Sequence, residues 1–135
     1  MQQRLTLPRS ARLKLDRDFA RVLSVSRRAE DRYLLVYVDE NQQELTRMGI
    51  RAHRRVGNAV QRNRIRRLIR EAFRLGRHEL PAGIDIVCIA KARPNSTNRR
   101  SPAPRLADYR ESLMRLVPRA RARPHHGAPG RARES

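Results

Sequence analysis

The chain has 135 residues, and its 32 lysines and arginines outnumber its 13 acidic residues to give a formal net charge of +19. This length is typical of one domain with a small core, and the charge implies nucleic acid or an anionic membrane as partner. No apolar run approaches the roughly 18 residues of a membrane span, the N-terminal sequence has no signal-peptide core, and Cys88 cannot form an internal disulfide. We therefore expect a cytoplasmic protein that does not bind a membrane.

A short helix and a strand are expected first. Asp16 can cap a helix in which Phe19, Val22 and Leu23 share one face. Residues 33–38 then form a strand, because they are rich in β-branched and aromatic side chains.

The remaining elements follow in the order strand, helix, strand, helix. After a turn at 40–44, the pattern predicts a strand over 46–52, a long helix over 58–75, a strand over 84–90 and a closing amphipathic helix over 106–117. The order αββαβα is typical of a small, single-domain α+β sandwich. Because the second and third strands flank a helix, we expect a βαβ crossover with a parallel pair.

The long helix is the most informative element, because residues 54–74 contain eight arginines and one acid. Apolar residues recur on one face at i, i+3, i+4, i+7 and i+8, namely Ile65, Leu68, Ile69, Ala72 and Phe73. Asn58 is the expected N-cap, and Gly76 is expected to end the helix in a left-handed conformation. Glu71 is expected to pair with Arg67, which leaves most of the positive charge unbalanced. We therefore expect this face to bind phosphates rather than to be an ordinary solvated surface.

The arginine-rich helix also carries a family resemblance. Residues 57–70, GNAVQRNRIRRLIR, resemble the signature of the bacterial ribonuclease P protein subunit, and weaker similarity covers about residues 4–117. The resemblance implies that the βαβ crossover is left-handed, against the usual rule. We expect a ribonuclease P protein-like domain over 1–117 and a disordered basic tail over 118–135, because the tail has no apolar residue larger than alanine outside its prolines.

The resemblance also implies a function. Members of this family help a catalytic RNA subunit to remove the 5′ leader of precursor tRNA, so the holoenzyme is an endoribonuclease and the protein alone is inactive. Magnesium ions belong to that holoenzyme and lie mainly on RNA phosphates. The sequence agrees, because it shows no zinc-ligand spacing, no phosphate-binding glycine loop and no carboxylate pair on one expected face. We assign no catalytic residue and no metal ligand.

Two RNA-binding surfaces are expected. The arginine surface, expected to bind the RNA subunit, comprises Arg54, Arg55, Asn58, Arg62, Asn63, Arg64, Arg66, Arg67 and Arg70. On the first strand, Tyr33, Leu35 and Tyr37 alternate onto one face beside the first helix, where the two tyrosines are either core or a stacking platform for bases. The resemblance implies that this face is a cleft for the leader. It would be lined by Arg12, Phe19, Leu23, Tyr33 and Tyr37, although Leu23 stands where the family commonly has an aromatic residue.

Other classes of basic protein fit less well. A structural RNA-binding protein of the ribosomal type would share the charge, the size and the tail but would have no substrate cleft. A helix-turn-helix DNA-binding protein is disfavoured because a strand is expected before Gly57, so we expect no DNA partner. A ribonuclease that acts alone is opposed by the missing catalytic groups.

Overall fold

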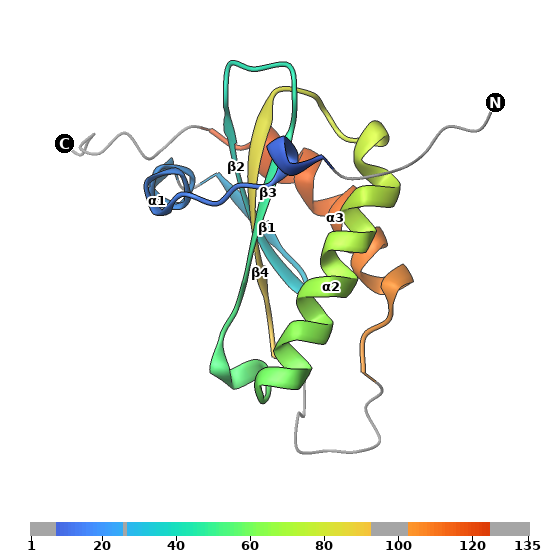
Figure 1. Cartoon of the computed structure of the whole chain (residues 1–135). Helices are drawn as coiled ribbons and strands as arrows, with labels where there is room; N and C mark the ends of the chain where they lie inside the picture. Colours follow the sequence, from blue (N-terminus) through green and yellow to red (C-terminus); the bar gives the residue numbers. More distant parts are fainter. Residues whose placement is uncertain (1–7, 26, 93–102, 125–135) are drawn as a thin grey trace.

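The computed structural model describes residues 8–25, 27–92 and 103–124. One four-stranded sheet separates α1 on one face from α2 and α3 on the other (Figure 1). The elements are α1 (Asp16–Val25), β1 (Arg28–Glu30), β2 (Leu34–Glu40), β3 (Arg47–Ala52), α2 (Ala59–Gly76), β4 (Ile84–Ala90) and α3 (Leu106–Ala122), with short 3₁₀ turns at Arg9–Ala11, Arg54–Val56 and Arg77–Glu79. No helix in these ranges has the length and apolar character needed to cross a bilayer.

The sheet has the strand order β1-β2-β4-β3 and is mixed. β4 pairs antiparallel with β2 and parallel with β3. The expected parallel pair across α2 is therefore confirmed, and the hand of this crossover stays a prediction. β4 lies between two neighbours and under helices on both faces, which explains why its sequence is almost continuously apolar.

The short strand β1 was not expected. It pairs antiparallel with β2 at the sheet edge, so the observed order is αβββαβα instead of αββαβα. Only Ala29 of its three residues is buried, and the other two are charged. A strand this short shows no alternation that could be recognised in the sequence, and it forms because β2 offers a ladder of backbone partners.

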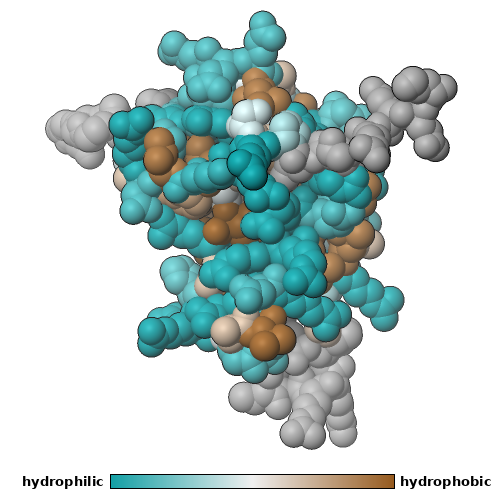
Figure 2. All heavy atoms as spheres, viewed as in Figure 1, coloured by the Kyte–Doolittle hydropathy of each residue, from teal (hydrophilic) through white to brown (hydrophobic). Residues whose placement is uncertain are grey.

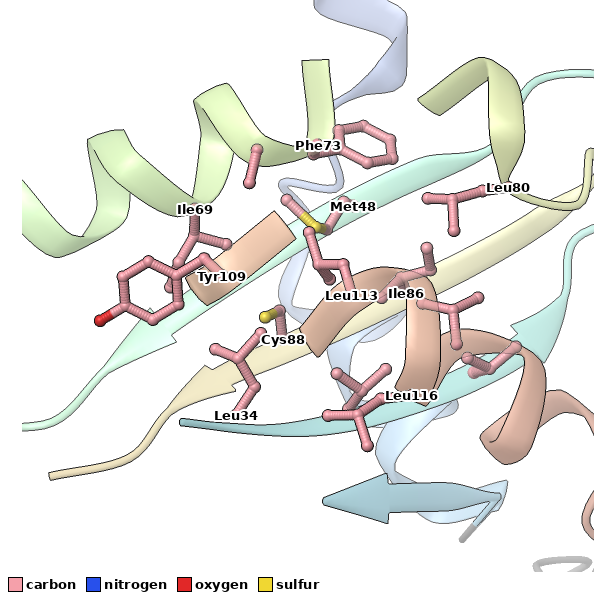
Figure 3. Packing of buried hydrophobic residues seen from close by; sticks show 14 of the residues in the cluster. Leu34, Met48, Ile69, Phe73, Leu80, Ile86, Cys88, Tyr109, Leu113 and Leu116 are labelled. Atoms are coloured by element: carbon pink, nitrogen blue, oxygen red, sulfur yellow. The ribbon is translucent and has the colours of Figure 1, made fainter. Parts of the chain in front are cut away.

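The main core lies between the sheet and the α2–α3 pair (Figure 3). Leu34, Val36 and Val38 of β2 point into it and are fully buried. Ile86 and Cys88 of β4 lie on the same side, and burial raises the pKa of the Cys88 thiol. Each large side chain buried in this way contributes about 1.5–3 kcal/mol, so these layers fix the position of α2 on the sheet.

The end of α2 differs from the expectation. Gly76 is helical, with φ −108°, and the chain continues into the 3₁₀ turn Arg77–Glu79 without a left-handed residue. A Cβ at Gly76 would lie 2.6 Å from Cε of Met114 on α3. The prediction of a left-handed stop was wrong because this glycine permits close packing of two helices and does not serve as a cap.

The end of α3 also lies beyond the expected boundary at residue 117. The helix includes Pro118 and continues to Ala122, so residues 118–122 are helical rather than part of a disordered tail. Ala120 is fully buried, and Arg27 donates a hydrogen bond to the carbonyl of Arg121. These contacts hold the last turn in place despite the proline. The rest of the expected tail from residue 125, and residues 93–102 of the long connection, lie outside the described residues.

Candidate RNA interface

α2 begins with a capping box that positions the arginine surface. The Asn58 side chain accepts a hydrogen bond from the backbone N–H of Gln61, and the Gln61 side chain accepts one from the backbone N–H of Asn58, each at 2.8 Å. Gly57 precedes them with φ 152°, and a Cβ there would lie 2.2 Å from Oε1 of Gln61. The N-cap prediction at Asn58 is confirmed. Gln61, which fits the apolar stripe poorly, serves the cap.

The apolar stripe of α2 faces the core as expected. Ile69, Ala72 and Phe73 are fully buried, and Ile65 and Leu68 are half-buried against the same cluster. The nine residues of the arginine surface are exposed or half-buried; Arg62, Arg66 and Arg70 are the half-buried ones. Arg66 also donates a hydrogen bond to the side chain of Asn63 at 3.1 Å. The fold therefore presents a basic helix face to solvent.

The charge of this face is hardly compensated within the protein. Glu71 binds Arg74, one helical turn later, and does not pair with Arg67 as expected. The reason is geometric, because Arg74 presents its guanidinium to both carboxylate oxygens of Glu71. Among residues 8–25, 27–92 and 103–124, no carboxylate lies within 4.0 Å of Arg62, Arg64 or Arg67. Such a surface gains most from an anionic partner.

Phe19 lies between α1 and the sheet. A Cβ at Gly49 of β3 would lie 2.2 Å from Cζ of Phe19, so the ring rests directly on the backbone of that strand. The ring is only 8% exposed, and the guanidinium carbon of Arg51 lies 4.6 Å from its centroid. Phe19 is therefore at the expected place but mostly enclosed, and Arg51 presents the accessible surface.

Tyr37 and Leu23 lie beside Phe19 in the same small cluster, and both are half-buried. Nη1 of Arg28 donates a hydrogen bond of 3.3 Å to the Tyr37 hydroxyl from the neighbouring strand. The structure thus brings Phe19, Leu23 and Tyr37 together, as the family resemblance implies. It adds Arg28, which had no recognisable signal because β1 itself was not expected.

Tyr33 does not join this group. It precedes β2, and its backbone N–H donates to the side chain of Asp31, which turns the chain before the strand begins. Its ring packs edge-on against Tyr109 of α3, with centroids 6.3 Å apart, on the opposite face of the sheet. The prediction that Tyr33 shares a face with Tyr37 was wrong, because the alternation of a strand does not extend through a turn.

Arg12 connects the two surfaces. The segment around it follows the free edge of β3, where the Leu13 N–H donates to the carbonyl of Met48 at 3.0 Å. A hollow of about 330 Å³, here called the α1 hollow, opens beside it and is lined by Arg12, Leu13, Lys14, Phe19, Met48, Gly49, Ile50, Arg70 and Phe73. Arg12 and Phe19 of the expected leader cleft thus share a cavity with Arg70 of the arginine surface. The face of the molecule that is seen in Figure 1 is mainly hydrophilic, with small apolar patches (Figure 2).

A buried ion-pair network fixes α1 on the sheet. Asp85 of β4 is fully buried and accepts two hydrogen bonds from Arg47, at 2.8 and 2.6 Å, and one from Asn41 at 2.9 Å. Arg21 of α1 also binds Asp85, and it donates to Asp39 at 2.5 Å. Burial by itself raises the pKa of Asp85, but the hydrogen bonds outweigh burial and hold this pKa below its usual value.

No group of three or more His, Cys, Asp or Glu side chains in the described ranges is arranged to hold a metal ion. The side chains at the α1 hollow are instead cationic and apolar, a combination that suits phosphates and bases.

Comparisons with known proteins agree with this geometry. A family model described as Ribonuclease P matches residues 7–114. The ribonuclease P protein component of Syntrophus aciditrophicus is 38% identical over 94 residues, which cover 70% of this chain and 79% of that protein. The component from Clostridioides difficile is 42% identical over 84 residues, covering 62% and 74% of the two chains.

Solved structures show the same fold. The ribonuclease P protein from Thermotoga maritima superimposes with a TM-score of 0.65 at 30% identity, covering 76% of this chain and 91% of that one. A mutant of the Staphylococcus aureus protein gives a TM-score of 0.67 at 27% identity, covering 83% and 89%. Because the family model spans most of the sequence and the fold agrees, this chain belongs to the ribonuclease P protein family.

Proposed function

We propose that the protein is the RNA-binding subunit of ribonuclease P, and that it binds the catalytic RNA subunit and the 5′ leader of precursor tRNA. The observation that carries this proposal is the α1 hollow, which joins Arg12 and Phe19 to Arg70 of the arginine surface. In this arrangement, the RNA subunit bound along α2 lies next to the single-stranded leader bound beside α1. We place this complex in the cytoplasm.

The two surfaces have different roles in this proposal. The arginine surface is exposed and lacks compensating acids, so it binds phosphates of the RNA subunit without reading the sequence. Phe19, Leu23, Tyr37, Arg28 and Arg51 form an apolar surface with cationic edges beside α1. A single-stranded leader fits this surface because unpaired bases stack on aromatic rings and on guanidinium planes.

Catalysis is assigned to the RNA subunit. Magnesium ions of the holoenzyme do not fit the protein surfaces described above, because the charged groups that line the α1 hollow are arginine and lysine, which repel cations. The ions would lie on RNA phosphates. A ribosomal-type RNA-binding role remains the alternative, and it requires no leader surface.

Reconstitution tests the proposal. Purified protein, a bacterial ribonuclease P RNA and precursor tRNA are combined at low magnesium concentration, and each component is omitted in turn. We expect cleavage at the 5′ end of the mature sequence only when the RNA subunit is present, and faster cleavage with protein than without it. Cleavage by the protein alone, or no acceleration by the protein, would overturn the proposal.

A further inference from the structure

A second hollow lies on the other side of α2. This α3 hollow has a volume of about 330 Å³ and opens between the turn before α2, the first half of α2 and the start of α3. Its rim carries Arg55, Arg64 and Lys91, and its apolar wall includes Ile65 and Leu68. In the described part of the chain, no carboxylate lines it. The arginine surface supplies Arg55 and Arg64 to this rim, but neither expected surface includes the apolar wall beneath them.

The cationic side chains at the rim differ in whether they already have a partner within the protein. Lys91 is engaged, because its Nζ lies 2.8 Å from Glu30 and 2.9 Å from the carbonyl of Asp31. Arg55 and Arg64 are exposed, and no carboxylate of the described residues lies within 4.0 Å of either. Two guanidinium groups therefore lie above an apolar wall without an acidic partner.

Core side chains form the inner wall of the cavity. Tyr109 lines it, is only 1% exposed, and packs edge-on against Tyr33. Burial raises the pKa of Tyr109 to about 12, so its hydroxyl stays neutral at physiological pH. Ile65 and Leu68 are held by the main core on their inner sides. The packing of the main core thus holds the inner wall of the cavity in place.

The guanidinium groups and the apolar wall of the cavity indicate which kind of ligand it can bind. Guanidinium groups bind phosphates and stack on nucleobases, and a volume of this size is at the lower end of the roughly 300–1,000 Å³ of ligand sites. In the sequence, residues 93–102 separate Lys91 from Ala103 of the lining, and they contain three arginines and no acid. Like charge disfavours them as occupant, whereas an RNA nucleotide offers both a flat apolar base and a negative charge.

We propose that the α3 hollow binds one unpaired nucleotide of RNA, with the base against Ile65 and Leu68 and the phosphate on Arg55 and Arg64. The proposal rests on the function proposed above and extends it. RNA would then contact α2 on two sides, at Arg70 in the α1 hollow and at Arg64 in the α3 hollow. The nucleotide can come from the RNA subunit or from precursor tRNA.

Filling the cavity tests this site. Ala103 is exposed on its rim, so Ala103→Trp occupies the space without removing a charge, and Ala103→Glu repels a phosphate. Ala107→Trp is the matched control, because Ala107 is exposed on α3 but does not line the α3 hollow. One arm measures the Kd of the protein for the RNA subunit, and the other measures the Kd of the holoenzyme for precursor tRNA. The measurement in which the Kd rises identifies the RNA that supplies the nucleotide.

We expect both Ala103 variants to raise the Kd at least about fivefold in one arm, the lower end of what one stacked base contributes. Ala107→Trp should match the parent in both arms. Thermal midpoints confirm that each variant folds. If both Ala103 variants match the parent, or if Ala107→Trp causes the same loss, the site assignment is overturned.

A double variant tests whether Arg64 acts in this cavity. If Arg64 binds the phosphate of the same nucleotide, Arg64→Gln combined with Ala103→Trp should raise the Kd by less than the product of the single effects. If the increase in Kd of the double variant equals the product of the two single increases, Arg64 binds elsewhere and the assignment is overturned. Measurements on the unmodified protein distinguish this proposal from the proposed function. If the unmodified protein does not accelerate cleavage, the proposed function is refuted. If it does, but the Ala103 variants bind both RNAs with unchanged Kd, only this site is refuted.

Discussion

Arg12 and Arg70 bring like charges to one cavity, the first from the N-terminal segment and the second from α2. Burial, followed by the positive charges of Arg12 and Arg66, lowers the pKa of Arg70. Such an arrangement is unfavourable in the free protein and is relieved when a phosphate lies between the guanidinium groups. We therefore expect the α1 hollow to bind an anion.

The first prediction concerns this pair. Over a salt series, Arg70→Ala should reduce the slope of log affinity against log salt by about 0.7–0.9 for RNA-subunit binding, and Arg12→Ala should reduce it by the same amount for holoenzyme binding to precursor tRNA. Arg119→Ala is the control, because Arg119 is exposed on α3 away from both hollows. If both variants keep the salt slope of the unmodified protein, Arg12 and Arg70 do not contact phosphate.

A second prediction compares two arginines of α2. Arg67 is exposed and has no carboxylate within 4.0 Å among the described residues, whereas Arg74 is bound by Glu71. Arg67→Ala should therefore reduce the salt slope by about 0.7–0.9, and Arg74→Ala should reduce it less. Equal reductions would mean that position on the helix, and not local charge compensation, decides which arginine binds RNA.

A third prediction concerns Tyr37. Tyr37→Ala should weaken holoenzyme affinity for precursor tRNA by about 1–3 kcal/mol, the contribution of one stacked base, and leave affinity for mature tRNA almost unchanged. Tyr37→Phe removes only the hydroxyl bound by Arg28 and should retain most of the affinity. Because Tyr37 is half-buried, thermal midpoints are measured in parallel. A folded alanine variant that weakens both RNAs equally would exclude Tyr37 from the leader surface.

Two glycines allow a fourth prediction. A Cβ at Gly49 would meet the Phe19 ring, which is held between α1 and the sheet, so Gly49→Ala should displace α1 and lower the free energy of unfolding by about 1–3 kcal/mol. Gly76→Ala meets the flexible end of Met114 and gains about 1 kcal/mol of helix propensity, so its net cost should be smaller. Chemical denaturation compares them. The reverse order would contradict this account of α1 docking.

The fifth prediction concerns pH and Asp85. Its pKa lies below the value of about 3.9 expected in the unfolded chain, so its ion pairs stabilise the fold above that pH and lose this contribution as pH falls through the lower folded pKa. Asp85→Asn should lower the free energy of unfolding at pH 7 by about 1–3 kcal/mol, because Arg47 and Arg21 lose their shared partner but stay close to Asp18 and Asp39. The difference between parent and variant should shrink in acid. A difference that does not change with pH would refute this account.

The periodicity of the sequence by itself determined the main elements and one candidate functional surface. The stripe from Ile65 to Phe73 specifies which side of α2 is buried, so the arginines between these positions must face outward. The apolar run of β4 likewise matches its observed bounds. These features depend on local spacing, which repeats along one element and needs no knowledge of its neighbours.

Only the tertiary structure decided which residues from different elements meet. Gly76 stands where a helix cap is expected, but it permits the close packing of α2 and α3. The turn at Asp31 directs Tyr33 away from the face of Tyr37. The strand β1 forms because β2 pairs with it. The two hollows are likewise made by contacts between elements distant in sequence. Local periodicity contains no information about such contacts, because they are set by how the layers pack and by where each turn leaves the chain.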